Sequence, residues 1–217
     1  MAMNSKIEEI SMSGLFEKSL RNYPFEEFYR IAKDNSEGRI WVIGGFVYKN
    51  IIKQLYGTPF EEEPIDIDFL SEGHAREIYP PKGEGWKLGR TSVGDLSVVK
   101  EGKYRLDLNG LINFHSITSR KLDPRIENFY TGTPLNIQSI SYDCERGVVE
   151  GEVGINAIRK KVVKFNNLEE LRWEAKRLSK LKKSDVSPDD LIKAKAEELG
   201  FEYRLPTLRS RFYMTHI

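Results

Sequence analysis

Two stretches decide the fold of this chain: Ile43-Gly-Gly-Phe-Val47 and, further on, Ile65-Asp-Ile-Asp-Phe-Leu70. In the second stretch, apolar and acidic residues alternate with a period of two. Side chains at positions i and i+2 of a β-strand emerge on the same side of the sheet. We therefore predict a strand over residues 65–70 that presents Asp66 and Asp68 together on one face. A half-buried strand without a functional role can show the same alternation, so neighbouring segments have to support this interpretation.

The first stretch joins a predicted strand to a predicted helix. The run Arg39-Ile-Trp-Val-Ile43 is typical of a buried strand, and residues 46–56 carry apolar side chains at helical spacing. Gly44 and Gly45 lie between these two elements. Glycines at this point let the backbone approach a phosphate closely while the amides and the positive end of the helix face it. The alternative is a plain tight turn.

A third aspartate follows in Lys103-Tyr-Arg-Leu-Asp-Leu108. The same alternation places Arg105 and Asp107 on one face of a short strand, with Leu106 and Leu108 directed into the core. Asp107 can then join the other two aspartates from a neighbouring strand. Its alternative is a surface aspartate on an exposed strand.

Three carboxylates in this arrangement suit divalent metal ions. Hard cations such as Mg²⁺ and Mn²⁺ prefer carboxylate oxygens together with the phosphates of a substrate. Two such ions, roughly 4 Å apart and bridged by carboxylates, neutralise a triphosphate and an attacking oxygen together. We therefore expect Asp66, Asp68 and Asp107 to be both metal ligands and catalytic residues, with magnesium or manganese as the cofactor.

This ordered series of elements resembles the head domain of the DNA polymerase beta superfamily, and in particular the branch of bacterial poly(A) polymerases and CCA-adding enzymes. Leu135-Asn-Ile-Gln-Ser-Ile-Ser-Tyr-Asp143 is similar to that branch's Phe-Thr-Ile-Asn-Ala-Leu-Ala-Tyr-Asp segment. Val153-Gly-Ile-Asn-Ala-Ile-Arg-Lys-Lys-Val162 resembles its Gly-Gly-Leu-x-Asp-Leu stretch. The resemblance covers about residues 38–165 and implies a nucleotidyltransferase fold of the α+β class, a mixed sheet flanked by helices.

The resemblance also implies an activity, the transfer of a nucleoside monophosphate from a nucleoside triphosphate such as ATP to a hydroxyl acceptor. An RNA or transfer RNA 3′ end is one candidate acceptor. Gly44 and Gly45 would seat the triphosphate, Lys49 would contact it as a point charge, and Gln138 would hydrogen-bond a ribose or phosphate where the family carries Asn. The alternatives are an exposed lysine on the helix and a structural amide.

The sequence also departs from the family. Tyr48-Lys49 replaces the family's Arg-Asp after the diglycine, and Gly132-Thr-Pro134 lies near the place of an absent Arg-Arg-Asp. These departures motivate a second hypothesis, a catalytically inactive nucleotidyltransferase-like module for binding or assembly. A third, a toxin-like enzyme that modifies transfer RNA, shares the chemistry and differs only in its partner.

Around this core we expect further strands over residues 86–90, 96–100 and 104–108, and helices towards both ends. The terminal helices are predicted over about 24–34, from Asn167 with Glu170 at capping-box positions, and from Ser187-Pro188 to Gly200. We therefore divide the chain into an N-terminal helical segment packed on the core (1–37), the nucleotidyltransferase core (38–165) and a helical C-terminal tail (166–217).

Composition sets the remaining expectations. The chain has 217 residues, of which 39% are hydrophobic, enough for one full core with a small appendage. Lys and Arg total 34 against 33 Asp and Glu, so any contact with nucleic acid has to be local. The single cysteine, Cys144, excludes an internal disulfide, and no apolar run approaches the ~20 residues of a membrane span. We predict a cytoplasmic protein without a membrane partner.

Two basic features could make such a local contact. One is a cluster on a predicted helix, and the other is a C-terminal tail in which aromatic and basic residues alternate, a combination that holds single strands by stacking and phosphate contact. The alternatives are a solvated helix face and aromatic residues that dock the tail onto the core. The residues are Lys176, Arg177, Lys180, Lys182 and Lys183 in the cluster, and Tyr203, Arg204, Arg209, Arg211, Phe212 and Tyr213 in the tail.

Overall fold

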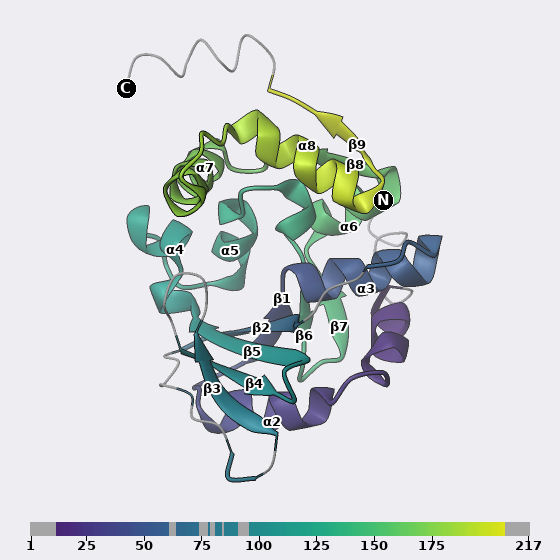
Figure 1. Ribbon diagram of the computed structural model, residues 1–217, viewed down its shortest axis with the longest axis vertical. Helices are drawn as coiled ribbons and strands as arrows, with labels where there is room; N and C mark the ends of the chain where they lie inside the picture. Colours follow the sequence, from purple (N-terminus) through teal and green to yellow (C-terminus); the bar gives the residue numbers. More distant parts are fainter. Residues whose placement is uncertain are drawn as a thin grey trace.

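The computed structural model of the protein describes residues 12–60, 64–73, 78, 81–83, 85–90 and 96–206. Within these residues, seven strands form one sheet in the order β3-β4-β5-β2-β1-β6-β7 (Figure 1). Only β2 and β5 pair in parallel, and the other neighbours are antiparallel. The strands are β1 (Ile40–Ile43), β2 (Ile65–Ser71), β3 (Trp86–Arg90), β4 (Leu96–Lys100), β5 (Tyr104–Gly110), β6 (Ser141–Asp143) and β7 (Val148–Glu150). The predicted α+β class with a mixed sheet is confirmed.

The centre of the sheet leads directly into a helix. All residues of β1 are buried, as their unbroken apolar run predicted, and α3 (Gly45–Tyr56) begins right after Gly44. Gly44 has φ +69° and ψ −141°, a conformation that side-chain-bearing L-residues avoid. The predicted order of strand, diglycine turn and helix is confirmed, and its turn needs a glycine at position 44.

Hydrophobic residues cover both faces of the sheet. Ile67 and Phe69 of β2 face the larger core, which also receives apolar side chains of α2 (Phe25–Asp34) and α3. Leu70 faces a second core on the other side, with α4 (His115–Ser119) and α5 (Ile126–Gly132). Because alternate residues of a strand face opposite sides, Asp66 and Asp68 lie on the Leu70 side of the sheet. That side is therefore apolar at one end of β2 and acidic at the other.

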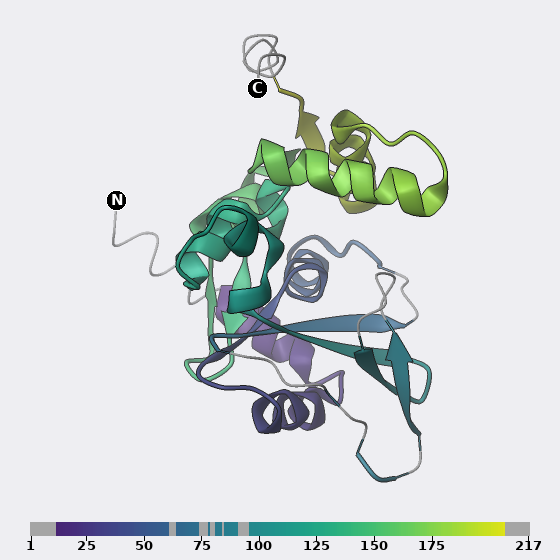
Figure 2. The ribbon, with the colours of Figure 1, turned by 90° about the vertical axis from the view of Figure 1, so that its left-hand side faces the viewer.

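The C-terminal part adds a second, two-stranded sheet. After α6 (Glu152–Lys160), β8 (Val162–Lys164) pairs in parallel with β9 (Glu202–Arg204), and α7 (Leu168–Lys182) and α8 (Pro188–Leu199) connect them. Figure 2 shows α7 and α8 stacked above the main sheet. The sequence predicted the two helices but not β9, so the tail is more than helical. Arg209 and Arg211 lie outside the described residues, and the division into three segments stays a prediction.

The two C-terminal helices begin with different caps. The Ser187 side chain accepts a hydrogen bond from the backbone N–H of Asp190, whose carboxylate accepts one from the backbone of Ser187, a complete capping box. The Asn167 side chain accepts from the backbone N–H of Glu170, but the Glu170 carboxylate contacts Nδ1 of His115 at 2.9 Å instead. The capping box predicted for Asn167 and Glu170 is therefore only half present. None of the helices in the described ranges is long and apolar enough to cross a membrane.

One close helix contact gives a stability prediction. A Cβ atom added at Gly154 of α6 would lie 2.6 Å from the carbonyl oxygen of Ser139, so the backbones would have to separate. We expect Gly154→Ala to lower the free energy of unfolding by ~1–3 kcal/mol. Gly14, within helical residues 12–20, has no atom within 4 Å of such a Cβ, and Gly14→Ala should raise stability by ~0.5–1 kcal/mol. Denaturant unfolding measures both, and equal effects would contradict the close contact.

Candidate metal and nucleotide site

The pairing of β2 with β5 brings the three predicted aspartates together. In this parallel register Asp68 lies directly beside Asp107, and Asp66 lies beside Arg105. Adjacent strands are ~4.8 Å apart and laterally paired residues of parallel strands face the same side, so these side chains leave the sheet on one face. On its other edge β2 pairs with β1, where Ile43 lies beside Asp68. The diglycine turn therefore follows the strand position closest to the acidic pair.

Asp68 is the electrostatic centre of this group. Burial, followed by the negative charges of Asp107 and Asp66, raises the pKa of the Asp68 carboxyl to about 7, although the Arg105 guanidinium acts in the opposite direction. Asp66 differs from it, because its side chain is 50% exposed and its Oδ1 lies 3.4 Å from Nη1 of Arg105. The site thus combines a partly buried carboxylate whose pKa is raised with a solvated one held near a cation.

The donor set fits a magnesium ion that is shared with a substrate. In the described part of the chain, no group of three or more His, Cys, Asp or Glu side chains is placed to hold a metal ion by itself. Magnesium rarely uses such an all-protein cage, and it typically takes one or two carboxylates together with water and substrate phosphates. Asp68 and Asp107 offer carboxylates of that kind on adjacent strands. A cation there would also offset the repulsion that raises the pKa of Asp68.

The diglycine turn lies against this carboxylate. A Cβ atom added at Gly44 would be 3.4 Å from Oδ2 of Asp68, so the bare backbone of Gly44 borders the acidic pair. Gly45 begins α3, whose first amides have no partner inside the helix. These amides and the positive end of the helix suit an anion next to the carboxylates.

Lys49 is held by the C-terminal helices. Its Nζ lies 2.5 Å from Oε1 of Glu198 on α8, and its side chain is only 11% exposed. Burial disfavours the charge of Glu198, but hydrogen bonds from Lys195 and Lys49 outweigh it and lower the pKa of that carboxyl. The alternative of a solvent-exposed Lys49 is therefore wrong. A contact between Lys49 and a triphosphate stays a prediction and would compete with this ion pair.

The ion pair itself can be measured. We expect Lys49→Met to lower the free energy of unfolding by ~1 kcal/mol, because it leaves Glu198, whose side chain is 33% exposed, with one cation fewer. Lys53→Met, one turn further along α3 at an exposed position, should change it by less than ~0.5 kcal/mol. A double-mutant cycle with Glu198→Gln gives the coupling energy, and a coupling near zero would contradict a stabilising role for the pair.

Gln138 points its amide into its own turn. It ends η2 (Asn136–Gln138), and its Oε1 accepts a hydrogen bond from the backbone N–H of Leu135 at 3.0 Å. The neighbouring Asn136 fastens β8, since its side chain donates to the carbonyl of Val162 and accepts from the backbone N–H of Lys164. The structure thus favours the structural amide at Gln138, and nucleotide binding by this residue stays a prediction.

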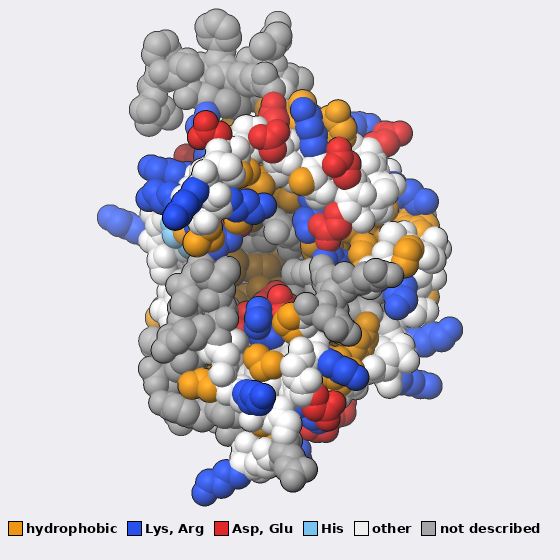
Figure 3. All heavy atoms as spheres, viewed as in Figure 1, with side chains coloured by type: hydrophobic (Ala, Val, Ile, Leu, Met, Phe, Trp, Pro, Cys, Tyr) orange, Lys and Arg blue, Asp and Glu red, His pale blue; other side chains and the backbone are white. Residues whose placement is uncertain are grey.

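The molecular surface is hollowed between the C-terminal helices and the sheet, with acidic and basic side chains on the wall of the hollow (Figure 3). A cavity of about 120 Å³ adjoins Asp66, with Lys49, Lys53 and Asn50 in its lining. This cavity is smaller than usual sites for whole ligands, which occupy ~300–1,000 Å³. Its lysines suit a phosphate group more than a complete nucleotide.

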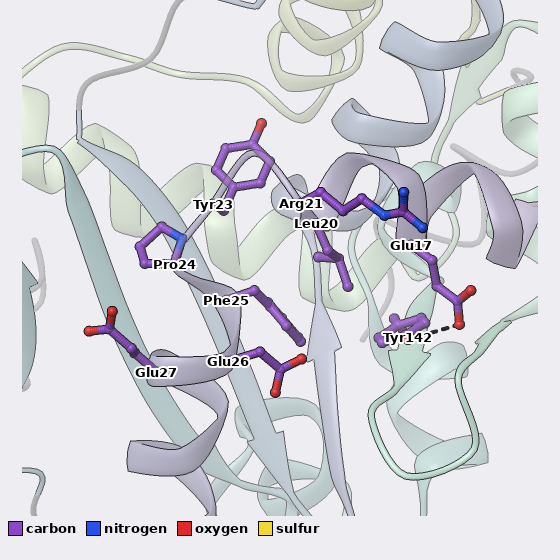
Figure 4. Close-up of a pocket in the computed structure, with 9 residues that line it drawn as sticks. All are labelled: Glu17, Leu20, Arg21, Tyr23, Pro24, Phe25, Glu26, Glu27 and Tyr142. Atoms are coloured by element: carbon purple, nitrogen blue, oxygen red, sulfur yellow. Dashed lines mark hydrogen bonds between the residues drawn. The ribbon is translucent and has the colours of Figure 1, made fainter.

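A larger cavity, of about 440 Å³, lies between the N-terminal helical residues and α2 (Figure 4). Its lining carries the carboxylates of Glu17, Glu26 and Glu27 against one cation, Arg21. Tyr142 donates a hydrogen bond to Glu17 across it. None of the residues that the sequence predicted for the site lies in the lining of this larger cavity.

Comparison with known structures supports the fold. The structure is similar to a CCA-adding enzyme solved with ATP, with a TM-score of 0.50 at 14% sequence identity over 86% of this chain and 41% of that one. A CCA-adding enzyme with CTP matches with a TM-score of 0.49 and 14% identity over 92% and 44% of the two chains. The Bacillus stearothermophilus CCA-adding enzyme with CTP gives 0.43 and 18% over 82% and 39%.

These likenesses concern the fold. The chain spans less than half the length of these structures. Neither the family models nor the curated proteins contain a match to the sequence. The mixed-sheet fold expected from the sequence is therefore shared with the CCA-adding enzyme solved with ATP.

Two residues of the site carry roles that the sequence did not predict. The alternation placed Arg105 on the same face as Asp107, but only the register of β2 and β5 sets it beside Asp66. Glu198 lies far along the chain from Lys49 and has no local pattern that could have indicated their ion pair.

Proposed function

We propose that this chain is a metal-dependent nucleotidyltransferase that transfers a nucleoside monophosphate from a nucleoside triphosphate to the hydroxyl of an RNA 3′ end. One observation carries the proposal. Asp68 and Asp107 lie side by side on adjacent strands, and Asp68 also borders the glycine turn that precedes α3. A cation-binding acidic pair beside an anion-binding helix end suits a metal-bound triphosphate.

The residues divide the work by position. Gly44 and Gly45 bring backbone amides to the phosphates, and Asp66, Asp68 and Asp107 would hold the metal ions that accompany the triphosphate. Magnesium, when bound, neutralises charge on the phosphates and on the attacking oxygen. Asp107 orients the acceptor hydroxyl by accepting a hydrogen bond from it. Arg105, next to Asp66, balances the negative charge of the acidic group before substrate arrives.

The reaction forms one bond and breaks one. The acceptor oxygen bonds to the α-phosphorus, and the bond from that phosphorus to the oxygen bridging to the β-phosphate breaks. Pyrophosphate leaves with this oxygen, and the hydroxyl proton passes to Asp107 or to water. Burial and the negative charges of Asp107 and Asp66 raise the pKa of the Asp68 carboxyl, and a bound divalent cation would lower it.

The choice of RNA as acceptor draws on the structural comparison. The similar solved proteins are named as CCA-adding or tRNA-processing enzymes, and several contain CTP or ATP. The formal net charge of +1 offers no general attraction to RNA, so the acceptor needs a local basic surface.

The experiment incubates the protein with magnesium, total RNA and each nucleoside triphosphate in turn, labelled at the α-phosphate. We expect label to appear in RNA with the wild type and to fall more than ~100-fold with Asp66→Asn/Asp68→Asn, since even residues that merely support metal ligands cost 10–100-fold. Asp123→Asn/Asp185→Asn removes the same charge at exposed positions and should retain activity. Triphosphates labelled at the γ-phosphate should leave RNA unlabelled.

The rival hypothesis, an inactive binding module, makes the opposite prediction. Its support is the engagement of Lys49 by Glu198 and the replacement of the family's Arg-Asp by Tyr48-Lys49, with Tyr48 buried. If no triphosphate gives transferred label while the protein still binds RNA, the binding module is favoured over the enzyme.

A further inference from the structure

A basic pocket lies on the C-terminal side of the molecule, apart from the three aspartates. It has a volume of about 250 Å³ and is formed by α6, β8 and β9. Among the described residues, its lining contains the cations Lys160, Lys164 and Arg204 and no acidic residue. In a chain with nearly equal numbers of acidic and basic residues, three cations around one cavity are a local concentration of positive charge.

The fold sets these side chains around the cavity. Val153, Asn156 and Lys160 recur at helical spacing, so they share one face of α6 with Ala157. On the opposite wall, Lys164 of β8 lies beside Arg204 of β9 in the parallel register. The pairing of two strands distant in sequence therefore places Arg204 next to Lys164.

The strand wall is held in place by side chains behind it. The amide of Asn136, itself 3% exposed, donates to the carbonyl of Val162 and accepts from the backbone N–H of Lys164, at 3.0 and 2.9 Å. Asn136 thus fixes the backbone that carries Lys164.

The three cations are available to a ligand. None of them forms an ion pair with another residue in the ranges that the structure describes. Arg204 contributes a planar guanidinium that can bind a phosphate through two hydrogen bonds, whereas the lysines act as point charges. The lack of acidic residues in the lining disfavours a metal ion or a basic peptide.

We propose that this pocket binds a phosphate group in the backbone of an RNA strand. The cations suit the phosphate, and the apolar side chains of Val153, Ala157 and Val162 in the same lining suit the sugar beside it. The proposal rests on the proposed function only for the choice of RNA, as the strand whose 3′ end would receive the nucleotide. It assigns the local basic surface that a chain of net charge +1 requires.

The test measures the affinity of a fluorescent single-stranded RNA of about 12 nucleotides, a length within typical single-strand sites. Magnesium and triphosphates are left out. We expect Lys160→Gln/Lys164→Gln/Arg204→Gln to bind at least ~10-fold more weakly than the wild type. The slope of the logarithm of the binding constant against the logarithm of the salt concentration should become shallower by about 0.7, the value for one phosphate contact on a single strand. Arg204→Glu alone should weaken binding in the same direction.

The matched control changes two lysines and one arginine at exposed positions outside both the pocket and the α7 cluster, Lys18→Gln/Arg30→Gln/Lys87→Gln. It removes the same charge and should weaken binding by less than ~3-fold. Equal losses in the two triple variants would overturn the pocket assignment. Thermal unfolding of all variants confirms that each is folded.

Measurements of phosphate binding and of nucleotidyl transfer separate the remaining interpretations. In one outcome, the pocket substitutions leave RNA affinity unchanged while inorganic phosphate stabilises the wild type but not the pocket variant. In that case the pocket binds a free anion, and the assignment to RNA is wrong. If the protein binds RNA through the pocket but transfers no nucleotide, the proposed function is wrong and this inference stands. If it transfers nucleotides while the pocket substitutions leave RNA affinity unchanged, this inference is wrong and the proposed function stands.

Discussion

Asp68→Asn is expected to stabilise the metal-free protein at pH 8 by ~2–3 kcal/mol and to reduce nucleotidyl transfer more than ~100-fold. Both effects have one cause. Burial and the charges of Asp107 and Asp66 disfavour the ionised carboxylate at Asp68, and the neutral amide removes that cost. The same substitution removes a ligand from the proposed metal site. A gain in stability with a loss of activity is typical of residues kept for function.

The pH dependence follows from the sign of the shift. The pKa of Asp68 is about 7 in the folded protein against 3.8 for an unperturbed aspartate. The folded protein therefore holds this proton more tightly than the unfolded chain does, and the wild type gains stability from this group as the pH falls from about 7 to about 4. The advantage of Asp68→Asn is thus full at pH 8 and lost near pH 4.

Denaturant unfolding of the two proteins across this pH range measures the difference directly. Asp123→Asn, whose side chain is 76% exposed in the wild type, is the control and should show no such trend. A constant difference between Asp68→Asn and the wild type from pH 4 to pH 8 would contradict a raised pKa at Asp68. Saturating magnesium and triphosphate should raise the stability of the wild type but not of Asp68→Asn.

Gly44→Ala is expected to have the second largest effect. Its φ of +69° with ψ −141° is nearly restricted to glycine, and its added Cβ would lie 3.4 Å from Oδ2 of Asp68. We expect the free energy of unfolding to fall by ~1–3 kcal/mol from backbone strain. Transfer should fall by more than this loss of stability explains, because relief of the strain moves the amides that border Asp68.

Gly57→Ala is the matched control at the other end of α3. Gly57 also has a positive φ, +70°, in the left-handed conformation, but no atom lies within 4 Å of its added Cβ. It should lose ~1 kcal/mol of stability and keep its transfer activity. Kinetics and unfolding on the same preparations separate strain from function. Equal activity losses in the two variants would indicate that Gly44 has only a structural role.

The parts of the fold that were predicted correctly depend on local sequence. The alternation of Asp66 and Asp68 with apolar residues fixes which face of β2 they occupy, whatever the neighbours of that strand are. Gly44 likewise ends a fully apolar run and begins a helical pattern. The spacing of apolar residues and the glycine turn depend only on neighbouring residues, so these elements could be predicted without tertiary information.

The relationships that could not be predicted are all long-range. The sequence contains no signal for the register that sets Asp68 beside Asp107. A register shifted by one residue would place the Asp107 side chain on the opposite face of the sheet from Asp68. Glu170 fits a capping box by spacing, yet its carboxylate meets His115 from another helix. The strand β9 is three exposed residues long and is defined only by its pairing with β8.

We propose that the aspartates of β2 and β5 hold divalent cations together with a triphosphate. Titrating Mn²⁺ into the protein with a non-hydrolysable triphosphate analogue, and counting the bound ions by electron paramagnetic resonance, measures this binding. We expect about two bound ions per wild-type chain. Asp66→Asn/Asp68→Asn should show no binding above that of the free analogue, and Asp123→Asn/Asp185→Asn should equal the wild type. Equal Mn²⁺ binding by the wild type and Asp66→Asn/Asp68→Asn would show that these aspartates do not hold the cations.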